Sequence, residues 1–161
     1  MPVSDHDLIQ AWQTVLDLCQ VSAGNTVTIL TDRHSNPQSV AAATSALQAR
    51  GAIVTRIELQ PMNAEKSLSR DPLAYLGSTP LTGNQAAMAA CLASDLVLDL
   101  MLLLFSPEQQ QILQSGTRIL LAVEPPEILV RLVPTRDVEC RHGCLICPGP
   151  VPARPGIRLC R

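Results

Sequence analysis

The chain has 161 residues, a formal net charge of −2 and 47% hydrophobic residues, which is enough for one folded domain with its own core. Aromatic residues make up only 2% of the chain, so the core must be built from Leu, Val, Ile and Ala. The small negative charge argues against a nucleic-acid partner, because no basic stripe is available to neutralise phosphates.

Targeting signals are missing from the sequence. The amino-terminal stretch carries acidic residues where a secretory signal peptide needs positive charge. The most apolar run, residues 96–105, contains Asp99 and is too short to cross a bilayer. The cysteines crowd towards the carboxyl end, unlike the even spread of a secreted disulfide scaffold. We therefore expect a cytoplasmic protein that makes no membrane contact.

Residues 5–19 predict an amphipathic helix, because apolar side chains recur there at three- and four-residue spacing. Either Ser4 or Asp5 can cap its amino end. Trp12 belongs to the apolar stripe, and we interpret it as a core residue rather than as a platform for a ligand. A strand is expected next, at residues 26–30.

A polar loop at 31–36 follows this strand, and a helix should then run from about 37 to 50. Asp32, Arg33 and His34 of the loop could bind a polar ligand. The alternative is a solvated turn in which Ser35 or Asn36 only caps the helix. A lone His without an acidic or Cys partner at ligand spacing is weak support for a metal site. The strand is not followed by a G-x-G-x-x-G sequence, which argues against a nucleotide cofactor here.

The middle of the chain predicts one strand and one helix. Residues 52–59 alternate only partly, as expected of a strand near a sheet edge. The connection 60–82 is polar, contains three prolines, and is long enough to be a lid or a subunit contact. An Ala-rich helix should then span residues 85–93, where small side chains allow close packing.

The densest signals lie in residues 94–127. Residues 95–100 form an apolar run of the right length for a strand buried on both faces. Ser106 to Gln109 then reads as a helix start, with Ser at the cap, Pro next, and a Gln able to close a capping box. Gly116 is placed to end this helix, and residues 117–123 predict a second buried strand. Such a strand–helix–strand unit is nearly always right-handed with parallel strands.

The resulting expectation is an α/β fold, a Rossmann-like parallel sheet of about four strands with helices on both faces, followed by an irregular carboxyl-terminal tail. A last helical turn or two is expected at residues 127–133. Ligands of open α/β sheets bind at the carboxyl ends of the strands. Leu104, Phe105 and Ser106 should therefore lie on the functional edge.

A family resemblance adds to this interpretation. The run LTGNQAAMAACLASDLVLDLMLLLFSPEQQQILQSGTRILLAVEPPEILVRLVPTRD resembles the 2,5-dihydroxypyridine 5,6-dioxygenase family, and MPVSDHDL, SNPQSVAAA and AYLGSTPLTGN fit it in the same order. The resemblance covers residues 1 to about 137. It implies a fold related to thermophilic metallo-aminopeptidases and a role in aerobic nicotinate breakdown, by ring cleavage with Fe(II) and O₂.

The resemblance also implies site residues. The family's iron is held by two His and one Asp in a carboxyl-terminal domain that this sequence does not match, so no metal ligand is assigned and no cofactor is expected for this chain. The family has a His just before the Ser-Pro-Glu-Gln helix start, which deprotonates the substrate, a small pyridine. This sequence has Phe105 there, and a phenyl ring cannot accept a proton. Leu104 matches the family's substrate-pocket wall, so the catalytic set is empty and Leu104 is the predicted substrate-binding residue.

The likeness stops after Asp137. Residues 138–161 are rich in Cys, Pro and Arg and have no helical or strand period. We interpret them as a disordered or frameshifted tail. The alternative is a zinc site at Cys140, His142, Cys144 and Cys147, or a [4Fe–4S] cluster at the three cysteines.

Two hypotheses follow for function. The first is a truncated dioxygenase-like protein whose amino-terminal domain, residues 1–137, is inactive alone. The second is a non-catalytic binding or assembly module, for which a homo-oligomer is one possible state. In either case we expect residues 101–105 and 128–133 to form an exposed apolar patch that promotes association.

Overall fold

The computed structural model describes residues 3–60 and 79–133. Most of the connection 60–82 and the whole Cys-rich tail 138–161, including the four candidate metal ligands, lie outside the described residues. Within them the chain alternates helices and strands in the order α1 (Asp5–Leu18), β1 (Thr26–Thr31), α2 (Pro37–Ala49), β2 (Ile53–Glu58), α4 (Gln85–Ala93), β3 (Leu96–Asp99), α5 (Pro107–Gln114), β4 (Arg118–Leu121) and α6 (Pro126–Leu132).

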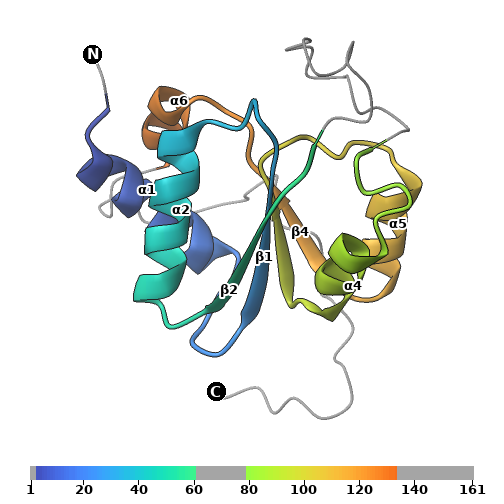
Figure 1. Ribbon diagram of the computed structural model, residues 1–161. Coiled ribbons are helices and arrows are strands. Elements are labelled where there is room, and N and C mark those ends of the chain that lie inside the picture. Colours follow the sequence, from blue (N-terminus) through green and yellow to red (C-terminus); the bar gives the residue numbers. More distant parts are fainter. Residues whose placement is uncertain (1–2, 61–78, 134–161) are drawn as a thin grey trace, which may run out of the picture.

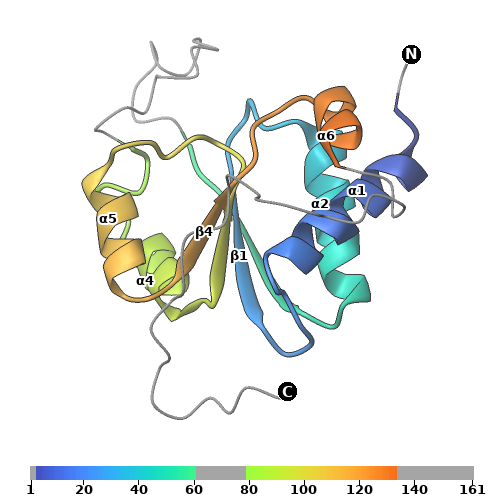
Figure 2. The same ribbon diagram turned by 180° about the vertical axis from the view of Figure 1, so that it is seen from behind.

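The strands form one four-stranded parallel sheet in the order β2-β1-β3-β4, as the predicted α/β fold requires. Helices α1, α2 and α6 cover one face, and α4 and α5 cover the other (Figures 1 and 2). Side chains of β1 and β3 alternate between the two faces. Val27 and Leu98 pack against α1 and α2, whereas Leu30 and Val97 pack against α4 and α5.

Local signals set the helix ends as expected. Ser4 caps α1, Asn36 caps α2 and Ser106 caps α5, each by accepting a backbone N–H bond through its side-chain oxygen. Gly116 follows the end of α5 with a φ of +87°, in the left-handed conformation that suits glycine there. Trp12 is 1% exposed and belongs to the core, which confirms its interpretation as a packing residue.

Strand β4 differs from the prediction. It was expected to be buried, but it is an edge strand. Arg118 is exposed, and Ile119, Leu120 and Leu121 are half-buried. A run of apolar residues cannot by itself distinguish a central strand from an edge strand. Strand β2 forms the opposite edge, where its partial alternation had placed it. No helix in the described parts of the chain is both long and apolar enough to cross a membrane.

Candidate functional site

The order of the strands creates a topological switch point between β1 and β3. From β1 the chain crosses through α2 to β2 on one side, and from β3 it crosses through α5 to β4 on the other. The two crossing helices lie on opposite faces of the sheet (Figure 1). In open α/β sheets, ligands bind in the crevice that opens at the carboxyl ends of the strands at such a point. The two loops there are residues 32–36 and 100–106, and both had been candidates.

The first loop is a closed turn organised by Asp32. Its side chain is only 8% exposed, and its Oδ1 accepts the backbone N–H groups of His34 and Ser35, both at 2.9 Å. Asn36 then caps α2 by accepting the N–H groups of Gln38 and Ser39. The expected cap is therefore present, but the turn is not simply solvated, because its carboxylate is buried.

Ser35 joins the first loop to the second. Its Oγ lies 3.0 Å from the carbonyl oxygen of Leu100 and accepts a 2.9 Å bond from the backbone N–H of Asp32. Ser35 and Leu100 are 65 residues apart in the sequence. This contact brings the polar loop and the Leu104–Phe105 loop together at one point of the sheet edge.

Asp99, the last residue of β3, shapes the second loop. Its carboxylate is 1% exposed and accepts three successive backbone N–H groups, those of Met101 and Leu102 at 2.9 Å and that of Leu103 at 2.7 Å. Leu102 has a φ of +69°, so these N–H groups form a concave nest of the kind that binds anions. The protein's own side chain fills this nest and fixes the path of the loop.

Phe105 projects from the end of this loop. Its side chain is 74% exposed and its φ is +54°, a left-handed conformation that is uncommon for an aromatic residue. Leu104, just before it, is half-buried. The backbone N–H of Phe105 donates to Oε1 of Gln109 at 2.9 Å. The capping box expected here is thus shifted by one residue, since Gln109 had been expected to bond to Ser106.

The prediction of an exposed apolar patch is wrong for most of this loop. Met101, Leu102 and Leu103 are only 5%, 9% and 0% exposed, and Met101 and Leu103 pack in the core with residues of α4 and α5. At the other proposed stretch, Leu132 is 69% exposed and Ile128 is 37% exposed. Of the predicted patch, the described residues thus leave Phe105, Ile128 and Leu132 as the clearly exposed large apolar side chains.

Burial governs the electrostatics of this edge. It raises the pKa of the Asp99 carboxyl despite the three N–H bonds, and the charge of nearby Asp32 raises it further. Desolvation, with a smaller contribution from Asp99, raises the pKa of the buried Cys91 thiol to about 11. Cys91 is therefore a packing residue and not a thiolate nucleophile at neutral pH.

Glu108 ties a third segment to the site. It lies in the first turn of α5 and is 9% exposed, and its Oε1 accepts a 2.7 Å bond from Oγ1 of Thr82. Among the described residues no group satisfies its other oxygen. Sequence reasoning had used Glu108 only as a helix-start residue, and it had missed Asp99 and Ser35. The signal that could have identified Asp99 is an acid inside an apolar run, where a charge needs partners.

The described residues do not fit an iron site. A mononuclear Fe(II) centre of the facial-triad type needs two His and one carboxylate that converge on one point. In residues 3–60 and 79–133, no group of three or more His, Cys, Asp or Glu side chains is arranged to hold a metal ion.

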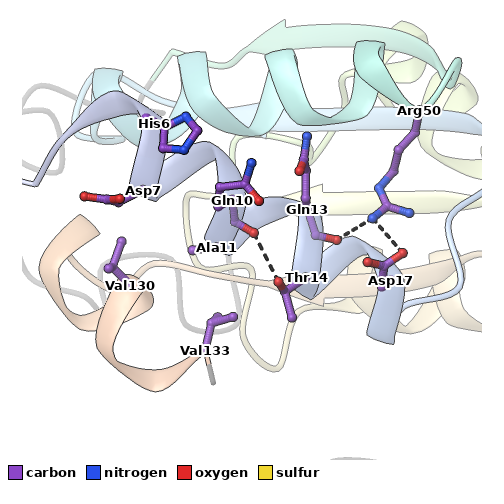
Figure 3. A pocket seen from close by; sticks show the side chains of 10 residues that line it. All are labelled: His6, Asp7, Gln10, Ala11, Gln13, Thr14, Asp17, Arg50, Val130 and Val133. Carbon is purple, nitrogen blue, oxygen red and sulfur yellow. Dashed lines mark hydrogen bonds and ion pairs between the residues drawn. The ribbon is translucent and has the colours of Figure 1, made fainter. Parts of the chain in front are cut away.

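A separate hollow of about 630 Å³ lies on the other side of α1, between α1 and α6. Figure 3 shows His6, Gln10, Thr14 and Asp17 along α1, with Arg50 reaching Asp17 from the end of α2. Some of these groups are engaged with each other. Oγ1 of Thr14 donates to the carbonyl of Gln10, and Arg50 pairs with Asp17 at 2.7 Å. None of the candidate residues lines this hollow, and we assign no ligand to it.

Comparison with known proteins places the chain. The sequence profile of the 2,5-dihydroxypyridine 5,6-dioxygenase family matches residues 7–143. A 2,5-dihydroxypyridine 5,6-dioxygenase of Pseudomonas putida KT2440 is 50% identical over 141 residues, which cover 88% of this chain and 40% of the relative. The solved structure of 2,5-dihydroxypyridine dioxygenase from the same organism matches with a TM-score of 0.76 and 49% identity, over 84% of this chain and 39% of that one. The chain thus spans about two fifths of the length of these relatives.

Proposed function

The chain belongs to the 2,5-dihydroxypyridine 5,6-dioxygenase family, and we propose that it supplies the substrate-facing sheet edge of such a protein without ring-cleaving activity of its own. The observation that carries this proposal is the loop 100–106, which presents the exposed Phe105 at the switch point. Leu104 beside it would wall the pocket for a planar pyridine. A role in nicotinate degradation rests on the resemblance alone, and the cytoplasmic location predicted from the sequence is kept as part of this proposal.

Two features support the lack of activity. Phe105 has no atom that accepts a proton, so general-base assistance from this position is absent. The described residues also provide no triad for Fe(II), so any ring cleavage would need groups from outside them. We expect the chain to bind a hydroxylated pyridine weakly and to leave it unchanged.

The test is direct. The purified chain is mixed with Fe(II), O₂ and 2,5-dihydroxypyridine, and loss of the substrate's ultraviolet absorbance is followed against a metal-only blank. We expect the rate of the blank. Turnover at the rate of an ordinary enzyme, about 1 s⁻¹ or more, would overturn the proposal.

A second candidate function, a binding or assembly module, is favoured by the edge strand β4. Its residues Ile119 to Leu121 are apolar and only half-buried, whereas the opposite edge strand carries Arg56 and Glu58. Charged side chains protect sheet edges from pairing with another chain, and β4 has only Arg118 at its start. We propose that a second copy of the chain associates through this edge.

Light scattering after gel filtration tests this candidate. We expect dimers or larger species at micromolar concentration, reduced to monomer by Leu121→Lys on β4. The matched control, Thr55→Lys on β2, should leave the mass unchanged. A monodisperse wild-type monomer would rule out association through this edge.

A further inference from the structure

Strand β4 and the residues directly after it carry one charge at each end of an apolar run. The stretch 118–124 reads Arg-Ile-Leu-Leu-Ala-Val-Glu, and its two charged residues, of opposite sign, are both exposed. The apolar residues between them are half-buried, apart from Val123, which is 41% exposed. In the described residues, β3 is the one strand that pairs with β4. The other side of β4 is therefore a row of backbone groups without a neighbouring strand.

The backbone bonds of β4 identify the residues that form this row. The N–H groups of Arg118 and Ala122 donate to the carbonyl oxygens of Asp95 and Asp99 on the β3 side. Along a parallel strand, alternate residues turn their N–H and C=O groups towards the same neighbour. The residues in between turn theirs away from β3, and these are Ile119, Leu121 and Val123.

We propose that two copies of the chain pair antiparallel through β4 about a two-fold axis at Leu121, so that Arg118 of each copy lies opposite Glu124 of the other. This inference rests on the proposed association through this edge and specifies its register. A two-fold dimer joins the same surface of both copies, so each pair of opposite residues occurs twice. Leu121 would lie opposite itself and Ile119 opposite Val123. These residues all have outward backbone groups, as the hydrogen-bonded pairs of an antiparallel ladder require.

Charge complementarity selects this register over its neighbours. Directly opposite side chains of an antiparallel pair lie close together on one face, where opposite charges are stabilising. With the axis at Leu120, Arg118 would lie opposite Ala122. With the axis at Ala122, Glu124 would lie opposite Leu120. Of these three registers, the axis at Leu121 is the one that gives both charges a partner of opposite sign.

The alternation of side chains assigns both charges to the face of the sheet that α1 and α6 cover. Leu120 and Ala122 pack against the core on this face, and Arg118 follows the same alternation. Its guanidinium donates to the carbonyl of Cys19, just after α1, which holds it beside the edge. A guanidinium has five N–H donors, so a carboxylate can still bind to it. Glu124 is the next position of the alternation, and its carboxylate in the second copy would approach these donors.

The test is a charge swap measured by sedimentation equilibrium of the whole chain, with a reductant present so that cysteines form no disulfide. We expect a wild-type dimer at micromolar concentration that weakens as salt is added, because the charged pairs are exposed. Glu124→Arg should weaken the dimer about tenfold or more, since two attractive pairs become two repulsive ones. The double variant Arg118→Glu, Glu124→Arg should dimerise more tightly than Glu124→Arg alone. The matched control, Glu58→Arg on the opposite edge strand β2, should leave the dimer unchanged.

The register can also be measured on the wild type, so that the result does not depend on a variant folding. Isotope-filtered nuclear magnetic resonance of a mixed labelled and unlabelled dimer should show contacts from Ile119 to Val123 of the second copy. The outward N–H groups, including that of Leu121, should be protected from hydrogen exchange in the dimer and not in the dilute monomer.

The outcomes separate the register from the association itself. A dimer without contacts between Ile119 and Val123 of the two copies, or a double variant no tighter than Glu124→Arg, would overturn the register and leave the proposed association standing. A wild-type monomer at these concentrations would overturn both. Protection of the outward N–H groups that persists in the dilute monomer would assign this edge to another segment of the same chain, and would also overturn the inference.

Discussion

Asp99 is expected to be the strongest single support of the candidate site. Asp99→Ala would remove a 1% exposed carboxylate and leave three buried N–H groups without an acceptor. Each such group costs about 1–3 kcal/mol, so the free energy of unfolding should fall by about 3 kcal/mol or more even if the loop relaxes. A domain of this size is stable by only about 5–15 kcal/mol, so this is a large share.

Asp99→Asn gives a graded comparison. The amide oxygen can keep the bonds from Met101 and Leu102, but the amide nitrogen would face the N–H of Leu103. We expect a smaller loss, about 1 kcal/mol, because the substitution also removes a desolvated charge. Unfolding in urea is measured by the fluorescence of Trp12, the chain's single, buried tryptophan.

The pH dependence provides an independent check. Burial raises the pKa of Asp99, so the folded protein takes up this proton at a higher pH than the unfolded chain does. Because the folded state binds this proton first, lowering the pH increases the free energy of unfolding of the wild type. Asp99→Asn has no such proton to bind, so its stability does not gain this term. The stability difference between wild type and Asp99→Asn should therefore grow from pH 7 towards about 4. A difference that is absent at pH 7, or that shrinks as pH falls, would refute the assignment.

The remaining predictions concern neighbouring positions. Asp95 accepts the N–H of Thr26, which lowers its pKa, so the stability lost in Asp95→Asn should be present above about pH 4 and vanish as pH falls further, as measured by urea unfolding. Ser106→Ala should lower stability in urea unfolding by about 1 kcal/mol, because α5 loses its cap. Gly51→Ala should be destabilising in thermal unfolding, because φ is +74° and the new Cβ would lie 3.3 Å from that of Ala23. In a chimera that adds the remaining part of the Pseudomonas putida relative, Phe105→His should raise turnover by about 10²- to 10⁴-fold without changing iron content.

The elements were predictable because their signals are local. Each cap lies within three residues of the N–H that it accepts, as at Ser4, Asn36 and Ser106. The bounds of α4, Gln85–Ala93, match the expected range, since a flanking Asn and a following Ser mark both ends. The parallel sheet followed from the alternation of strands and helices, which requires crossover connections.

The arrangement of the site was less accessible. Sequence reasoning placed both loops at the functional edge but could not show that Ser35 and Leu100 touch, because that depends on β1 and β3 being neighbours. The edge position of β4 was missed for the same reason. Strand order is set by which helix covers which face, and no residue pattern within one strand records it.

The loop that carries Phe105 is held by residues other than Phe105. Asp99 fixes its start, Ser106 caps the helix at its end, and Gln109 binds the N–H of residue 105 itself. The side chain at 105 can therefore change without a change in the path of the backbone. The φ of +54° supports this view, because histidine adopts left-handed conformations more often than most residues, whereas phenylalanine is not among those favoured there. The backbone at position 105 thus suits the histidine that the sequence resemblance predicts for the family there, whereas a phenyl ring cannot accept a proton, and we propose that function differs at this position while the fold stays the same.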